Sequence, residues 1–231
     1  MNLLNAKAAE LGPSMMCADP GNLRAALLEL DSAGVDYFHF DVMDGHFVQN
    51  FALSPDVIRA LRPATTKRFD VHLMMHVPER YLECFVDSGA DSITVHLEAA
   101  GARASTLVED IRRRGCFAGV AISPKTPVSA LASVIRDVDL VCLMAVEPGF
   151  AGQAFIASTL PRLDELAELI AVTGASAKIQ IDGSVSLDRL AELQRRGASS
   201  FVGGTSLLFR PGSTLAREVG RARSLLAGSP R

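Results

Sequence analysis

The sequence predicts a single-domain α/β protein folded as a (β/α)8 barrel, the TIM-barrel architecture. Three observations lead to it: short β-rich runs alternate with amphipathic segments, glycines end several of those segments, and polar side chains end several of the β-rich runs. Eight such units in 231 residues fit one barrel. An open doubly wound sheet is the alternative, although it seldom needs eight regular units in so short a chain.

The predicted strands are short runs rich in branched and aromatic side chains. They comprise residues 12–16, 37–42, 68–74, 92–96, 117–122, 140–146, 178–182 and 200–203. Helices are predicted between them, where apolar residues recur at spacings of three and four. These comprise residues 21–32, 55–61, 78–88, 104–114, 128–135, 158–172, 186–196 and 215–226. We expect one domain over residues 1–231, with a core over about 11–226 and short flexible ends.

Composition argues against several classes of partner. The net charge is −3, and the arginine runs at 112–114 and 195–196 fall where predicted helices end, so they complement helix dipoles rather than bind nucleic acid. The longest strictly apolar run, 140–146, is too short to cross a membrane, and the N-terminus lacks a signal-peptide pattern. Four scattered cysteines are interpreted as buried thiols. We therefore expect a cytoplasmic protein that binds neither nucleic acid nor membrane.

Polar residues gather at the C-terminal ends of the predicted strands, where barrels place their active sites. Because side chains alternate along a strand, His39, Asp41 and Met43 share one face. By the same alternation His72 and Asp182 face inward from their own strands. These side chains are costly to bury without partners, so the pattern indicates a functional centre.

His39, Asp41, His72 and Asp182 together form a set of nitrogen and oxygen ligands. Such a set suits one divalent ion of Zn, Mn, Fe or Co better than Mg or Ca, which prefer all-oxygen shells. For any single pair, a structural His–Asp hydrogen bond in the core is the more common arrangement. Four ligand-type residues at three strand ends favour the metal site. His96 is expected near the pocket, and His46 and His76 in loop hydrogen bonds.

Glycine-containing loops follow the last three strands. Residues 147–153 can approach a ligand or close over it as a lid. The loops after the last two strands carry glycines and hydroxyls, where barrels commonly bind phosphate through backbone N–H groups without needing Lys or Arg. The predicted phosphate-binding positions are Gly183, Ser184, Gly204, Thr205 and Ser206.

Five motifs, in order, carry a resemblance over residues 12–209: HFDVMDGHFVQN, DVHLMM, VEPGFAGQAF, IQIDGS and FVGGTSLLF. SPKTPV at 123–128 adds to it. The chain resembles the ribulose-phosphate 3-epimerase family of metal-dependent (β/α)8 barrels. The resemblance implies an isomerase that inverts C3 of a phosphorylated 2-ketose through an enediolate. It also implies a dimer or hexamer.

The resemblance assigns roles position by position. Asp41 and Asp182 match the two acid/base residues, and His39, Asp41, His72 and Asp182 match the ligands of one divalent ion. The substrate-binding positions it implies, together with the loop positions above, are Ser14, Met43, His72, Met74, Met144, Gly149, Phe150, Ala151, Gly152, Asp182, Gly183, Ser184, Gly204, Thr205 and Ser206.

Departures from the usual family pattern bear on the substrate. Gln49 stands where a proline is usual, Ala151 gives GFAGQ, and Ser184 gives DGS; SMMCAD and GTS-x-LF also differ. Together they resemble the allulose-6-phosphate 3-epimerase branch, so the favoured substrate is a hexulose 6-phosphate, D-allulose or D-fructose 6-phosphate. D-Ribulose 5-phosphate, converted to D-xylulose 5-phosphate, is the alternative. A phosphosugar lyase or decarboxylase and a non-catalytic phosphosugar-binding barrel are remote alternatives.

Overall fold

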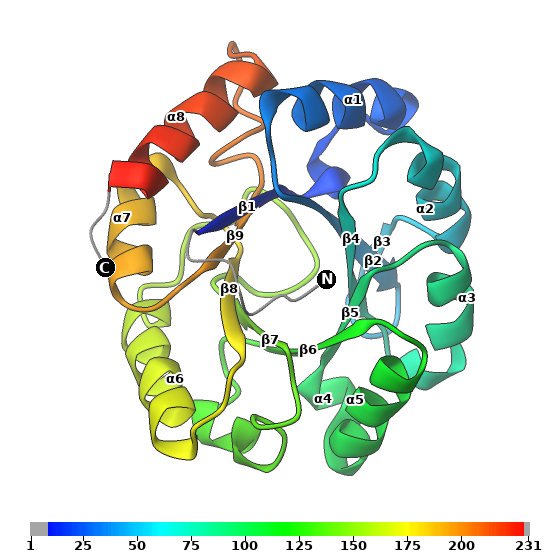
Figure 1. Ribbon diagram of the computed structural model, residues 1–231, viewed down its shortest axis with the longest axis vertical. Coiled ribbons are helices and arrows are strands. Elements are labelled where there is room, and N and C mark those ends of the chain that lie inside the picture. The colour runs from blue at the N-terminus through cyan, green and yellow to red at the C-terminus, as the bar shows by residue number, and fades with distance from the viewer. Residues whose placement is uncertain (1–8, 229–231) are drawn as a thin grey trace.

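Runs of branched and aromatic residues form the strands, which Figure 1 shows as a ring enclosed by helices. The computed structural model describes residues 9–228. The strands are β1 (Glu10–Pro13), β2 (Tyr37–Asp44), β3 (Phe51–Ala52), β4 (Arg68–Met74), β5 (Ser92–His96), β6 (Phe117–Ile122), β7 (Leu140–Met144), β8 (Lys178–Asp182) and β9 (Ser200–Gly203). Within the described part they form one sheet in the order β1-β9-β8-β7-β6-β5-β4-β2-β3, and only β2 and β3 pair antiparallel. The predicted barrel is confirmed.

The helices cover the outside of the ring. They are α1 (Leu23–Ala33), α2 (Pro55–Leu61), α3 (Leu82–Asp87), α4 (Leu97–Ala100), α5 (Ala104–Arg113), α6 (Thr159–Thr173), α7 (Leu187–Arg195) and α8 (Leu215–Gly228). Helices α1 and α8, far apart in sequence, pack against each other beside the seam of the barrel. No helix in residues 9–228 is long and apolar enough to span a membrane.

Three predicted elements differ from the structure. Strand β1 ends at Pro13, whose ring nitrogen carries no hydrogen to continue a ladder, and Met15–Cys17 turns as a 3-10 helix. The segment predicted as a helix over 128–135 is a 3-10 helix, Val128–Ser133. Strand β7 ends at Met144, and the loop that follows is closed by the Ile156 N–H donating to the Ala145 carbonyl at 2.9 Å.

Other expectations concern the chain ends and the cysteines. Residues 1–8 and 229–231, and with them most of the predicted flexible ends, lie outside the described residues. Cys116 and Cys142 are buried as predicted, whereas Cys17 and Cys84 are only half-buried.

An ion network lies at the N-terminal ends of the strands. Glu10 accepts from Lys178 Nζ at 2.7 Å and from Arg68 Nη2 at 3.0 Å, and both cations are buried. The Arg68 guanidinium also lies over the Tyr37 ring, 4.9 Å from its centroid. The floor of the barrel is thus polar and paired, while aromatic residues such as Phe69 pack outward with Phe40 at 4.6 Å between ring centroids.

The barrel closes where β1 meets β2. An isolated parallel bridge joins Ser14 to His39. Close approach depends on Gly12, because a Cβ at that position would lie 2.2 Å from the Tyr37 ring. The Tyr37 hydroxyl in turn donates to the Phe201 carbonyl at 3.2 Å, which ties β2 to β9 across the interior.

Gly12→Ala tests this closure. The added methyl must displace the buried Tyr37 ring, so we expect the free energy of unfolding to fall by about 1–3 kcal/mol. Urea unfolding measures it. Gly220→Ala is the matched control: Gly220 lies exposed within α8 with open space around it, so the same change should stabilise by about 0.5–1 kcal/mol. Equal stability of Gly12→Ala and the wild type would contradict the role of Gly12.

Candidate metal and acid/base site

Strand register brings the predicted polar residues together at the C-terminal ends of the strands. Strands β2 and β4 pair in parallel so that His39 lies opposite Asp70 and Asp41 opposite His72. The hydrogen-bonded partner of His39 is therefore Asp70 on the neighbouring strand. A carboxylate thus lies beside each of these two histidines on the neighbouring strand.

His39, Asp41, His72 and Asp182 form one buried cluster. One ligand-type atom from each lies within 4.8 Å of all the others. Asp41 Oδ1 lies 3.3 Å from both His39 Nε2 and His72 Nδ1, and Asp182 Oδ2 lies 3.5 Å from His72 Nδ1. Two imidazole nitrogens and two carboxylates thus face a common centre.

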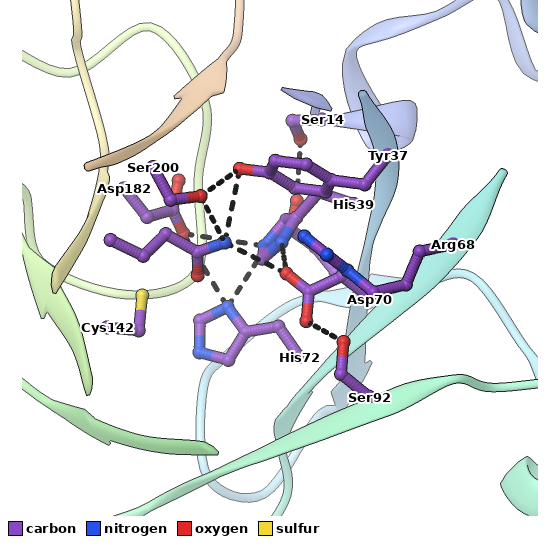
Figure 2. A network of polar contacts seen from close by, with 12 residues as sticks. Ser14, Tyr37, His39, Arg68, Asp70, His72, Ser92, Cys142, Asp182 and Ser200 are labelled. Atoms are coloured by element: carbon purple, nitrogen blue, oxygen red, sulfur yellow. Dashed lines mark hydrogen bonds and ion pairs between the residues drawn. The ribbon is translucent and has the colours of Figure 1, made fainter. Parts of the chain in front are cut away.

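The orientation of the His39 ring is fixed by a hydrogen bond on the side away from the cluster. Its Nδ1–H donates to Asp70 Oδ2 at 2.8 Å, which directs Nε2 toward the centre of the cluster. Asp70 also accepts from Ser92 Oγ at 2.6 Å and from Gln180 Nε2 at 2.9 Å. Figure 2 shows this network, with Asp70 between the His39 ring and Ser92. An anionic carboxylate therefore holds the ring in the geometry that a metal-binding imidazole needs.

The donor set fits a divalent cation. Among the described residues, His39 Nε2 has no hydrogen-bond partner of good geometry although it is fully buried. Burial alone would lower the pKa of His39, but Asp41 and Asp70 raise it well above its ordinary value. Burial alone would raise the pKa of Asp41, but His39 and His72 hold it well below its usual range. The cluster therefore stabilises positive charge at its centre, as a cation site must.

A second polar layer supports the cluster. Ser200 Oγ donates to the Tyr37 hydroxyl at 2.9 Å, and Gln180 Nε2 lies 3.2 Å from the same oxygen. In the view of Figure 2, Tyr37 and Ser200 lie above His39, and Asp70 and Ser92 lie below it. Gln180 and Asp182 share the inward face of β8 by strand alternation, which accounts for this layer.

A pocket opens above the cluster. Its lining residues come from the segment after β1, from the ends of β2, β4, β7, β8 and β9, and from the loops after β7, β8 and β9: Ser14, Met16, Cys17, Asp41, Met43, Met74, Met144, Val146, Glu147, Pro148, Gly149, Phe150, Ala151, Gly152, Gln153, Asp182, Gly183, Ser184, Val202, Gly204, Thr205 and Ser206. None of these described residues is Lys or Arg.

The pocket wall nearest the cluster is apolar and is formed by polarisable methionine side chains. Met43 and Met74 pack together with Val48, and Met144 packs with Cys142 and Ala121. All three methionines are nearly inaccessible to solvent. Ser14 Oγ donates to Asp41 Oδ2 at 2.6 Å, so the second oxygen of this carboxylate is also held. The methionines lower the dielectric next to Asp41 without adding competing protons.

The loop over 147–153 is held over the pocket by side-chain amides. Asn50 Nδ2 donates to the Gly149 carbonyl at 2.7 Å. Gln153 Nε2 donates to the carbonyls of Glu147 at 2.6 Å and Phe150 at 2.9 Å. Phe150 itself is 56% exposed. The backbone of the loop is therefore held at Glu147, Gly149 and Phe150, while the Phe150 side chain is presented to solvent.

The loops after β8 and β9 meet at the far end of the pocket. Gly183 has φ of +106°, and a Cβ there would lie 2.9 Å from the Val146 nitrogen. Ser184 adopts a left-handed φ of +50° despite its side chain, and its Oγ lies 3.3 Å from Ser206 Oγ. Two hydroxyls from separate loops are thus brought together beside backbone N–H groups.

The structure places almost every predicted substrate position on the pocket wall. His72 does not line the pocket; it is fully buried behind the two aspartates. His96 likewise lies behind His72 rather than in the pocket, with 2.9 Å between their Nε2 atoms. His46 and the His76 backbone both hydrogen-bond to Asp44 in the exit loop, as expected.

Four lining residues escaped the sequence prediction: Met16, Cys17, Val146 and Val202. Met16 and Cys17 do so because residues 12–16 read as a strand, whereas the 3-10 turn directs them to the pocket. Glu147, Pro148 and Gln153 also line the pocket, and they belong to the 147–153 loop that was predicted to approach a ligand.

Comparison with known proteins agrees with this geometry. The sequence profile of the Ribulose-phosphate 3 epimerase family matches residues 10–208. The chain is 41% identical over 196 residues to the ribulose-phosphate 3-epimerase of Treponema pallidum (strain Nichols), covering 85% of this chain and 89% of that protein. It is 38% identical to the ribulose-phosphate 3-epimerase of Bacillus subtilis (strain 168), covering 86% and 91%.

The fold is shared more widely. The crystal structure of 3-hexulose-6-phosphate synthase superposes with a TM-score of 0.68 at 16% identity, covering 94% of this chain and 99% of the other. At this identity the likeness shows the architecture alone.

Asn50→Asp tests whether the amide holds the 147–153 loop. The substitution removes the donor to Gly149 and leaves the neighbouring oxygen that accepts from the Phe51 N–H. Loss of one hydrogen bond worth about 1 kcal/mol should raise loop hydrogen exchange about fivefold, as measured by mass spectrometry. Asn22→Asp is the control, because the Asn22 side chain makes no capping bond at α1. Unchanged exchange at 149–152 would rule out this restraint.

Proposed function

The chain belongs to the ribulose-phosphate 3-epimerase family, and on that premise we propose that it interconverts D-ribulose 5-phosphate and D-xylulose 5-phosphate with a divalent metal ion held by His39, Asp41, His72 and Asp182. It is an isomerase of the epimerase class. The observation that carries the proposal is the buried His/Asp cluster at the floor of the pocket. A dimer or hexamer stays a prediction.

Two carboxylates serve opposite faces of the substrate carbon in this proposal. Asp41 and Asp182 come from β2 and β8, and both line the pocket. One takes the proton from C3 and the other delivers a proton to the opposite face, which inverts the centre. A single base reaches only one face, so the pair accounts for inversion where one residue does not.

The two oxygens of Asp41 have different partners. Asp41 Oδ1 faces the histidines, while Oδ2 receives the Ser14 hydroxyl at 2.6 Å. A divalent cation bound at the cluster supplies Lewis-acid stabilisation of the charge that develops on the substrate oxygens. The buried methionines exclude water from the reacting carbon.

The phosphate is assigned to the other end of the pocket. Ser184 and Ser206 offer hydroxyl donors, and Gly183, Gly204 and Thr205 offer backbone N–H groups. These neutral donors bind a phosphate dianion without a cation. The loop over 147–153 lies along the pocket wall and is assigned to covering the bound sugar.

A hexulose 6-phosphate is the second candidate substrate. The positions that depart from the usual family pattern include Met16, Ala151, Ser184 and Thr205, and all four line the pocket. Departures concentrated on the pocket wall favour a change in the sugar that it accepts. The named relatives favour the pentulose.

A phosphosugar lyase would need a catalytic lysine in the pocket, and no lysine of residues 9–228 lines it. Lys125 lies at the rim, 87% exposed and 3.2 Å from Glu147. Lys178 binds Glu10 at the opposite end of the barrel, and Lys67 binds Asp31. Lys7 lies outside the described residues.

The proposal is tested by following C3 in deuterated water by NMR. D-Ribulose 5-phosphate should be converted with deuterium at C3, at a kcat/KM at least about tenfold above that for D-fructose 6-phosphate, a difference of about 1.4 kcal/mol. Chelation should lower the rate by about 10²-fold or more, and added Mn, Co or Zn should restore it. A higher kcat/KM for D-fructose 6-phosphate than for D-ribulose 5-phosphate would make the hexulose 6-phosphate the assigned substrate. Full activity of metal-free protein overturns the metal site.

Asp41→Asn and Asp182→Asn test the two-base scheme. Each should lower kcat for epimerisation by about 10²–10⁴-fold, because inversion needs both groups. The variant that keeps the base facing the C3 proton should still exchange that proton with solvent without inversion. Metal content is measured in parallel, since both residues belong to the cluster. Wild-type epimerisation by either variant, with its metal bound, would falsify the scheme.

A further inference from the structure

A chain of polar contacts runs outward from His72 and is not used by the chemistry above. We propose that Glu98 is a positioning residue, which sets through His96 the ring nitrogen that His72 presents to the metal. The inference rests on the proposed metal site. It concerns how this chain prepares His72 for that site, and it extends the support of His39 by Asp70 to the second histidine.

The first step is the contact between the two histidines. His72 faces Asp41 and Asp182 with Nδ1, at 3.3 and 3.5 Å. Its other nitrogen, Nε2, lies 2.9 Å from His96 Nε2, and the rings are tilted by only 23°. Two nitrogens at this distance share one hydrogen, so one ring must donate and the other must accept.

The second step decides which ring donates. His96 Nδ1 lies 3.1 Å from Glu98 Oε2. Burial alone would raise the pKa of Glu98, but hydrogen bonds from His96, Thr126 and the Ser123 N–H lower it to about 2. An ionised carboxylate only accepts, so His96 Nδ1 carries the hydrogen. His96 is fully buried, and a neutral imidazole whose one hydrogen is on Nδ1 has a bare Nε2, so His96 Nε2 accepts from His72.

The consequence reaches the cluster. Because the His72 hydrogen is drawn to Nε2, the lone pair of His72 is available on Nδ1, the nitrogen that faces the aspartates. Reversing the direction of the chain would put a hydrogen on Nδ1, where a metal could not bind.

The far end of the chain is anchored firmly. Glu98 Oε1 accepts from the Ser123 N–H at 2.8 Å and from the Thr126 hydroxyl, both in the loop after β6. Arg162 of α6, only 8% exposed, donates through Nη2 to the carbonyls of Ser123 at 2.8 Å and Thr126 at 3.0 Å. The buried Arg162 guanidinium thus holds the loop, and the loop holds Glu98 in place. Glu98 in turn orients His96 against His72.

Glu98→Gln changes the hydrogen-bonding capacity of this side chain and leaves its size unchanged. An amide has one accepting and one donating end, whereas Glu98 accepts at both. If the amide oxygen faces Ser123, the NH2 meets the donor of His96; if it faces His96, the NH2 meets the donor of Ser123. Either arrangement sets a donor against a donor, so support for His72 is lost.

The direction of the chain is measured directly on the wild type. Protein labelled with 15N-histidine, assigned by comparison with His96→Asn, should show His96 as the Nδ1–H tautomer in metal-free protein. This spectrum needs neither a bound metal nor a Glu98 variant. Observation of the Nε2–H tautomer overturns the proposal.

Metal affinity supplies the second measurement. Competition with a chromophoric chelator should show Co²⁺ binding about 10–100-fold more weakly to Glu98→Gln, and the visible d–d spectrum of the remaining complex should shift. Glu168→Gln removes one carboxylate from the exposed surface of α6 and should bind Co²⁺ within about twofold of the wild type. Thermal unfolding in chelator establishes that each variant is folded.

The outcomes separate the two proposals. A wild type that binds no Co²⁺ overturns the metal site of the proposed function, while the His96 spectrum still decides the direction of the chain. A wild type that binds Co²⁺, with affinity and spectrum unchanged in folded Glu98→Gln, overturns the positioning role alone.

Discussion

Burying two carboxylates and two imidazoles against one another is the constraint on which the rest of the barrel interior depends. Each of these groups loses water on folding, and each loss must be offset by a partner. The hydrogen bond to Asp70 offsets the cost of burying His39, and the Ser14 hydroxyl does the same for Asp41. His72 is hydrogen-bonded to His96. The cluster is left with carboxylate charge facing a shared centre, which the proposed divalent cation would balance. The stability of the cluster and its proposed cation site are thus parts of one electrostatic arrangement.

The supporting layers explain why so much of the interior is polar. Asp70 would itself be a costly buried anion, but it lies among donors from Ser92 and Gln180, and hydrogen bonds from His39 and Ser92, with the charge of Arg68, keep its pKa well below the usual range although burial alone would raise it. Arg68 is paired in turn with Glu10 at the floor. Polar groups therefore continue along the axis, and the aromatic residues that a barrel core needs are placed on the outward faces of the strands.

Prediction from sequence succeeded where a periodic rule applies. Alternation along a strand placed His39, Asp41 and Met43 on the inward face, and their positions near strand ends placed them at one mouth of the barrel. Alternation does not specify register, so the pairing of His39 with Asp70 rather than with a residue of its own strand required the structure. The 3-10 turn after Pro13 also could not be predicted, because such a turn follows no hydrophobic period. This turn brings Met16 and Cys17 to the pocket. His96 was placed in the pocket because its strand end suggested it, whereas the His72 ring stands between it and the cluster.

The distribution of departures from the family pattern separates two kinds of residue in this chain. The cluster and its partners stand on strands, where a change of register or side chain would leave a buried charge unpaired. Ala151, Ser184 and Thr205 stand on loops at the pocket wall, where a change alters the shape presented to the sugar and leaves the cluster intact. A strained backbone at Ser184 is held by the Ser206 contact and the neighbouring Gly183 turn. On the proposed assignment, reaction type and sugar selectivity can therefore vary independently, because the first depends on the buried cluster and the second on the loops.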